Sequence, residues 1–162
     1  MSAASIRAAT PADVGAVFAL MYELAEFEKL THLFVATENS LHDALFGARP
    51  AAEALVAEQA SEVVGYALFF HNFSTFLARR GLYLEDLYVR PALRGSGLGT
   101  MMLKKLAAIA VQRECGRFEW SVLDWNQNAI DFYEKMGATV LPDWRVVRVT
   151  GDSLNRLASA AD

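Results

Sequence analysis

The order of the predicted strands and helices indicates an α/β protein, in which one mixed sheet carries helices on its faces. Short β-rich runs predict strands at 5–10, 54–58, 62–70, 81–89, 117–124 and 144–149. Apolar residues at helical spacing predict helices at 11–29, 37–46 and 97–114, with a shorter helix at 126–136. Hairpin strands followed by strand–helix–strand crossovers are typical of a mixed sheet.

Capping residues mark the ends of two of these helices. Thr10 is a predicted N-cap, with Pro11 at the first helical position and Asp13 in the first turn. Asn126 is suited to cap the short helix, and Gly137 can end it in the left-handed conformation.

Turn residues separate the strands. The string "QASE" predicts a hairpin with a four-residue loop between the second and third strands, and residues 71–80 are predicted to form a longer loop. Pro91 ends the strand at 81–89 because proline cannot continue a sheet ladder.

Length and composition fit a single domain over residues 1–162. Hydrophobic residues make up 54% of the chain and charged residues 21%, which is enough to build a core. The net charge of −4 offers no basic surface for nucleic acid, and no apolar run approaches the ~20 residues of a membrane span. One cysteine, Cys115, excludes an internal disulfide and fits a reducing compartment. We therefore expect a cytoplasmic protein that binds neither nucleic acid nor membrane.

A glycine-rich loop, "RGSGLG" at 94–99, directly precedes the third long helix. Gly95, Gly97 and Gly99 permit positive φ and close backbone approach, and the helix N-terminus behind them favours an anion. A phosphate or pyrophosphate is the natural ligand, and a glycine-rich turn without any ligand is the alternative. The spacing G-x-G-x-G differs from the dinucleotide fingerprint, and no G-x-x-x-x-G-K-[ST] string exists.

Two separate strings resemble the GCN5-related N-acetyltransferases (GNAT family). They are "YLEDLYVRPALRGSGLGTMMLKKL" and, further along the chain, "WNQNAIDFYEKMGA". The strings "LAEFEKL", "FGARP", "STF", "VLDWNQ" and "WR" extend the resemblance over nearly the whole chain, towards the spermidine/spermine (diamine) and thialysine acetyltransferases. The resemblance implies a mostly antiparallel sheet with a splayed central strand pair, and it also implies a homodimer.

The resemblance further implies acetyl-CoA as the cosubstrate and no metal. The loop would bind the pyrophosphate, the strand before it would hold the pantetheine arm through its backbone, and the short helix would contact the same arm. The implied cofactor-binding residues are Leu87, Tyr88, Val89, Arg94, Gly95, Ser96, Gly97, Leu98, Gly99, Thr100, Asn126, Gln127, Asn128, Ala129 and Tyr133.

Acetyl transfer to an amine requires that the ammonium lose a proton. The departing thiolate, in turn, benefits from gaining a proton. No nucleophile–base constellation is visible, so direct attack within a ternary complex is expected. Tyr133 is our predicted general acid, and Glu85 is predicted to take the amine proton through a water. The resemblance implies that Phe27, Glu28, Glu85 and Asp86 contact the substrate, although strand alternation predicts that Glu85 and Asp86 face opposite ways.

One departure concerns the choice of amine. Polyamine-specific members carry an acidic residue and a tryptophan before the central strand, where this chain has Ser74 and Phe76. A short diamine, thialysine or a lysine-like amine is therefore favoured over spermidine and spermine. The alternatives are acetylation of a protein N-terminus or an aminoglycoside, and a non-catalytic acyl-CoA-binding regulator. A phosphotransferase would need a Walker lysine and a Mg²⁺ constellation.

Overall fold

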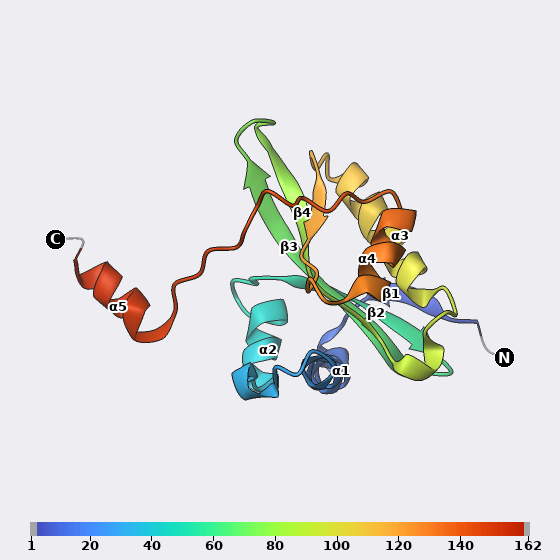
Figure 1. Cartoon of the computed structure of the whole chain (residues 1–162). Helices are drawn as coiled ribbons and strands as arrows, with labels where there is room; N and C mark the ends of the chain where they lie inside the picture. The colour runs from blue at the N-terminus through green and yellow to red at the C-terminus, as the bar shows by residue number, and fades with distance from the viewer. Residues whose placement is uncertain (1–2, 161–162) are drawn as a thin grey trace. The chain divides into compact units, whose positions relative to one another are not determined.

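The computed structural model describes residues 3–160 (Figure 1). Between Ser121 and Val122 the chain divides into two units, which are taken in turn below. Every helix within residues 3–160 is too short or too polar to cross a membrane.

One five-stranded sheet organises the first unit. Its strands lie in the order β1-β2-β3-β4-β5, and they are antiparallel except for the parallel pair β4–β5. This arrangement confirms the predicted mixed, mostly antiparallel sheet. The strands are β1 Ser5–Ala8, β2 Glu53–Gln59, β3 Glu62–Ser74, β4 Arg79–Val89 and β5 Phe118–Trp120.

Helices cover both faces of this sheet, as expected (Figure 1). On one face α1 (Val14–Phe27) and α2 (Glu38–Phe46) share a core with Ala54 and Val56 of β2. Leu55 and Ala57 alternate with these residues and are also buried, so they face the opposite side. There α3 (Leu98–Gln112) packs against β1, β2 and β4.

The predicted cap of α1 is present, and α2 is capped as well. Thr10 and Asp13 form a capping box at a 3₁₀ turn, Pro11–Asp13, which leads directly into α1. The Thr37 side chain accepts a hydrogen bond from the Ser40 backbone N–H at 3.1 Å. These contacts satisfy N–H groups that have no partner within the helix.

Two predicted loops are shorter in the structure. The turn between β2 and β3 contains only Ala60 and Ser61, and the φ of these residues, 51° and 64°, are the positive values typical of a tight type I′ hairpin. The expected loop at 71–80 is wrong as well, because the β3–β4 ladder continues until Ser74 pairs with Arg79. Only residues 75–78 remain outside the strands.

The described part of the second unit, residues 122–160, contains two helices, α4 (Gln127–Lys135) and α5 (Gly151–Ser159). The predicted cap of α4 is confirmed, since Asn126 Oδ1 accepts a hydrogen bond from the Ala129 N–H at 3.3 Å. Gly137 follows the helix with φ 94°, also as predicted. Helix α5 was not expected from the sequence.

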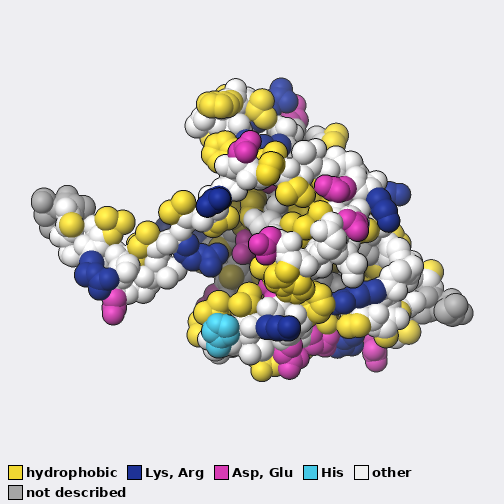
Figure 2. All heavy atoms as spheres, in the orientation of Figure 1, with side chains coloured by type: hydrophobic (Ala, Val, Ile, Leu, Met, Phe, Trp, Pro, Cys, Tyr) yellow, Lys and Arg dark blue, Asp and Glu magenta, His cyan; other side chains and the backbone are white. Residues whose placement is uncertain are grey.

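The strand predicted at 117–124 shortens to the three residues of β5, and the strand predicted at 144–149 is wrong. Residues 144–149 have no regular structure, and the Val147 side chain is 91% exposed. Figure 2 shows hydrophobic side chains along the segment that leads to α5. A strand needs a hydrogen-bonding neighbour, and no described segment of this unit pairs with these residues.

Candidate active site

A β-bulge in β4 places two neighbouring carboxylates beside one pocket. Leu68 of β3 lies opposite Asp86. The next residue, Phe69, lies opposite Leu84 instead, so Glu85 is an extra residue in β4. Glu85 and Asp86 therefore line the same pocket, and the prediction from strict strand alternation is wrong.

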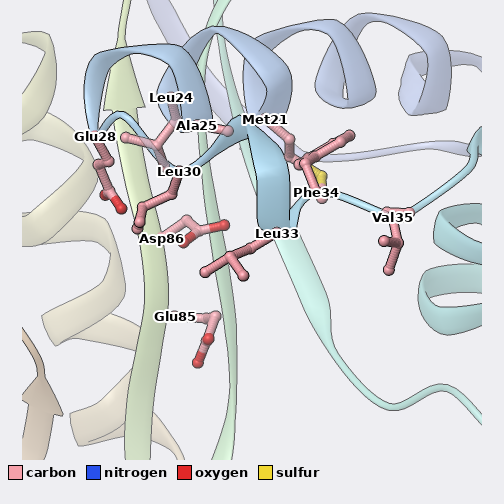
Figure 3. Close-up of a pocket in the computed structure, with 11 residues that line it drawn as sticks. Met21, Leu24, Ala25, Glu28, Leu30, Leu33, Phe34, Val35, Glu85 and Asp86 are labelled. Atoms are coloured by element: carbon pink, nitrogen blue, oxygen red, sulfur yellow. The ribbon is translucent and has the colours of Figure 1, made fainter. Parts of the chain in front are cut away.

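This pocket has a volume of about 420 Å³ and lies between β4, the end of α1 and the segment 30–36. In Figure 3, Glu28 reaches from the end of α1 towards Asp86, and Glu85 lies further along β4. Of the predicted substrate contacts, the structure thus brings Glu28, Glu85 and Asp86 together. The lining residues are Met21, Leu24, Ala25, Glu28, Leu30, Leu33, Phe34, Val35, Ala36, Glu85 and Asp86.

The electrostatics of the pocket favour a cation. Burial raises the pKa of Asp86 to about 6; the hydroxyl of Tyr66, which donates to Asp86 Oδ2 at 3.1 Å, lowers it, and the nearby charges of Glu85 and Glu28 raise it. Burial also raises the pKa of Glu28. Within residues 3–160 no salt bridge involves Glu28, Glu85 or Asp86. A bound ammonium would relieve these crowded negative charges.

Apolar side chains form the rest of the pocket. Leu24 and Met21 come from α1, and Leu30, Leu33 and Phe34 come from the segment after it. Such a wall suits the methylene groups of a substrate, while the carboxylates suit its charged end. The sequence reasoning missed this segment because residues 30–36 show neither helical nor strand periodicity. It also missed Tyr66, although a tyrosine in a buried strand needs a hydrogen-bond partner.

The glycine loop has the backbone that an anion site requires. Gly95 and Gly97 have φ of 81° and 89°, and Gly97 is the N-cap of α3. An added Cβ at either position would meet nothing within 4 Å, so the need for glycine there is conformational. The first turn of α3, with Leu98, Gly99 and Thr100, receives no hydrogen bond from a capping side chain. Its N–H groups therefore suit a pyrophosphate.

The strand before this loop has a free edge. Strand β5 pairs only with Leu82–Leu84 of β4, whereas β3 pairs with β4 as far as Val89. Within the residues that the structure describes, 85–89 therefore have a ladder partner on one side only. This is the parting of β4 from its neighbour that the sequence resemblance implied, and it leaves backbone groups near Leu87–Val89 for a ligand.

Arg94 and Phe27 were predicted to serve different ligands, but they contact each other. The Arg94 guanidinium lies 4.7 Å from the centre of the Phe27 ring and 5.8 Å from that of Tyr88. Its Nε donates to the Val89 carbonyl at 3.4 Å. The end of α1 and the glycine loop are thereby joined by a cation–π contact.

The remaining predicted residues belong to the second unit, on and beside α4. Asn126 caps the helix, and Gln127 Nε2 donates to Asp131 Oδ1 at 2.7 Å. The Tyr133 ring packs on Phe132, with centroids 5.4 Å apart. The roles of Asn126–Ala129 and of Tyr133 towards acetyl-CoA stay predictions.

Ser74 and Phe76, which replace the anchor residues of polyamine-specific members, lie at the β3–β4 turn. Ser74 is 4% exposed, and its Oγ accepts a hydrogen bond from the Leu77 N–H at 3.3 Å. The Phe76 side chain is fully exposed. Neither residue lines the acidic pocket. Residues 3–160 contain no group of three or more His, Cys, Asp or Glu side chains placed to hold a metal ion.

Comparison with known proteins assigns this architecture to a family. The sequence profile of the Acetyltransferase (GNAT) family matches residues 18–138. The chain is 40% identical to a thialysine N-epsilon-acetyltransferase of Mus musculus, over 98% of this chain and 99% of the relative. It is 37% identical to the L-ornithine N5-acetyltransferase of Arabidopsis thaliana, over 94% and 86% of the two chains.

A solved structure agrees with these sequence matches. An integron cassette protein from V. cholerae superimposes with a TM-score of 0.81 at 26% identity, over 98% of each chain. The family profile spans both the glycine loop and α4, which are the two regions that carried the sequence resemblance. The chain therefore belongs to the acetyltransferase (GNAT) family of enzymes, which use acetyl-CoA as the acetyl donor.

Proposed function

We propose that this enzyme transfers an acetyl group from acetyl-CoA to a primary amine of a small cationic substrate, namely a diamine, thialysine or a lysine-like amine. One observation carries the proposal. Glu28, Glu85 and Asp86 surround an apolar-walled pocket without a counter-ion in residues 3–160. The relatives named for thialysine and ornithine acetylation support the same class of acceptor.

In the proposed reaction the acceptor enters as an ammonium ion. Asp86 holds its charge, Glu28 adds to the negative electrostatic field, and Phe27 is proposed to contact the acceptor. Glu85 takes one proton from the ammonium through a water, which leaves a neutral amine. The nitrogen attacks the thioester carbon directly, so that a C–N bond forms and the C–S bond breaks. Tyr133 donates a proton to the departing sulfur, and the second proton that the nitrogen loses as the amide forms returns to the tyrosinate, so CoA leaves as a thiol and one proton is released overall.

The donor site is proposed from the predicted cofactor-binding residues. The backbone of Gly95–Thr100 suits the pyrophosphate, with Arg94 supplying positive charge after leaving the Phe27 ring. The free edge of β4 at Leu87–Val89 suits the amide groups of the pantetheine arm. Asn126–Ala129 are proposed to contact the same arm.

A panel of amines tests the proposal. Purified enzyme with acetyl-CoA is offered putrescine, spermidine, thialysine, lysine and a test peptide, and the release of free CoA is followed. We expect faster release with putrescine, thialysine or lysine than with spermidine or the peptide. Preference for the peptide would point to N-terminal acetylation. Acetyl-CoA binding without release on any amine would favour the regulator.

Tyr133→Phe, measured in the same assay, tests whether Tyr133 acts as the general acid and not as part of the acetyl-CoA binding site. Loss of the hydroxyl should lower turnover by about 100-fold, within the usual range for general acid catalysis, and the calorimetric affinity for acetyl-CoA should not change. Turnover close to that of the wild type would contradict the assignment of Tyr133.

We further propose that the enzyme is a cytoplasmic homodimer. The alternating segment "WRVVRV" at 144–149 is exposed and has no strand partner among the described residues of its own unit, which supports association through this part of the chain. The use of a single cysteine supports the cytoplasmic location. Sedimentation of the wild type beside Val147→Lys tests the dimer, because a new charge at an interface should shift the population towards monomer.

A further inference from the structure

Tyr66 brings a hydroxyl into a largely apolar core of the sheet. Its side chain is fully buried in the core that α1 and α2 share with the sheet. The hydroxyl donates a hydrogen bond to Asp86 Oδ2 at 3.1 Å. A buried hydroxyl without a partner would destabilise the fold, so the pair specifies where the Asp86 side chain lies.

The geometry gives the two oxygens of Asp86 different surroundings. Oδ2 accepts the hydrogen bond from Tyr66, and Oδ1 has no hydrogen-bond partner within residues 3–160. Asp86 also lines the pocket proposed for the acceptor amine. One oxygen is thus anchored to the core while the other stays available to an ammonium ion.

Tyr66 is a donor at every working pH. Burial and the charge of Asp86 raise the pKa of Tyr66 far above its usual range, so its hydroxyl does not ionise. The other titratable groups around Asp86 are Glu28 at the end of α1 and Glu85 beside it on β4, and both disfavour its ionised form. Segment 30–36 adds only apolar side chains to the lining. Within the described pocket, the Tyr66 hydroxyl is the group that favours the carboxylate.

We propose that Tyr66 is a positioning residue for the acetyl-transfer reaction, which keeps Asp86 ionised and turns its free oxygen towards the bound ammonium. This inference rests on the proposed function of the pocket. It assigns a role to a residue outside the pocket lining. The proposal depends on the single hydrogen bond from Tyr66 in the core to Asp86 in the pocket.

Tyr66→Phe removes this hydroxyl and retains the buried ring. The Asp86 carboxyl should then titrate about one pH unit higher than in the wild type, as expected for the loss of a hydrogen bond to a charged group. Carbon-13 NMR of labelled aspartate measures this titration directly, and Asp86→Asn assigns the signal. An unshifted midpoint would overturn the proposal.

Kinetics distinguish positioning from general damage to the fold. The ratio of kcat/KM for Tyr66→Phe to that of the wild type is measured from pH 6 to pH 8.5, with thialysine as the acceptor. The titration of the substrate cancels in this ratio, and kcat/KM reports the groups of the free enzyme. We expect the ratio to fall about fivefold from pH 8.5 to pH 6, which follows from a one-unit shift. A ratio that does not depend on pH would overturn the proposal.

Two controls complete the experiment. Tyr83→Phe removes another hydroxyl from the sheet, one that forms a hydrogen bond with Ser121 at 2.9 Å. The ratio of its kcat/KM to that of the wild type should not change with pH. If Tyr66→Phe does not fold, labelled tyrosine in the wild type replaces it. The Tyr66 ring signal should then titrate with the Asp86 midpoint, and Asp86→Asn should abolish that step. A wild type that acetylates no amine would refute the proposed function, and the NMR titrations would still decide whether Tyr66 keeps Asp86 ionised.

Discussion

The two ends of helix α1 handle negative charge in opposite ways. At its start, Asp13 is 7% exposed and receives two hydrogen bonds from the Arg7 guanidinium, at 2.8 and 3.0 Å. Hydrogen bonding by Arg7 lowers the pKa of Asp13 to about 2. At its end, Glu28 lines the same pocket as Asp86, and neither has a salt-bridge partner within residues 3–160. Burial raises the pKa of Asp86 to about 6.

This difference separates a carboxylate that supports the fold from one that is suited to bind a ligand. The helix dipole favours an acid at the start of α1 and disfavours acids at its end. Three interactions therefore stabilise the Asp13 carboxylate: the helix dipole, the hydrogen bonds from Arg7 and the hydrogen bond from the Thr10 N–H. The acids at the other end carry an unfavourable interaction that a bound cation would reverse.

The largest effect should come from Asp86→Asn. This change keeps the shape of the side chain and its ability to accept from Tyr66, but it removes the charge that would hold the ammonium. We expect kcat/KM for thialysine or putrescine to fall about 100- to 1,000-fold, or ~3–4 kcal/mol. A loss below threefold would place the substrate cation elsewhere.

The pH dependence of stability should differ in sign at the two ends. The ionised form of Asp13 stabilises the fold, and this contribution is lost as pH falls from about 3.8 towards 2. For Asp86 the raised pKa means that stability is lost as pH rises from about 3.8 through 6. Urea unfolding of the wild type and Asp86→Asn should show their difference in ΔG fall by about 2–3 kcal/mol between pH 4 and pH 7. A constant difference would contradict the raised pKa.

Asp13→Asn should reverse the pattern of Asp86→Asn. The change weakens the contact with Arg7 and the capping box, so we expect about 2 kcal/mol of stability to be lost at pH 7. Activity on the amine at a temperature well below the melting point should be unchanged. Denaturant midpoints and kcat/KM, measured on the same preparations, test both expectations. Stability equal to the wild type would show that the pairing is not structural.

Glu28→Gln should have the smallest effect. Glu28 caps the end of α1 and is less enclosed than Asp86, so it adds to the field without anchoring the cation. We expect KM for a diamine to rise about fivefold, close to 1 kcal/mol. KM for an uncharged amine analogue should change less. Equal changes in KM for the two substrates would show that Glu28 does not interact with the charge of the substrate.

Several parts of the site could be predicted from the sequence because they depend on local chemistry. The glycines at 95 and 97 occupy positive φ, and Asn126 caps α4, both as the string spacing indicated. Other parts depended on pairing between distant segments. The bulge at Glu85 exists because of how β4 meets β3, so strand alternation alone misplaced its side chain. The strand expected at 144–149 is absent since a β-rich pattern cannot supply its own partner.

By itself the sequence determined the family, the mixed sheet, the helix caps and the carboxylates available for an amine. These features follow from residue type and short-range spacing, which act within a few positions of the chain. Only the tertiary structure decided that Glu28, Glu85 and Asp86 share one pocket, that Arg94 lies on Phe27, and that Tyr66 donates to Asp86. These contacts join residues up to 67 positions apart, as in the pair of Phe27 and Arg94, and folding alone brings such residues into contact.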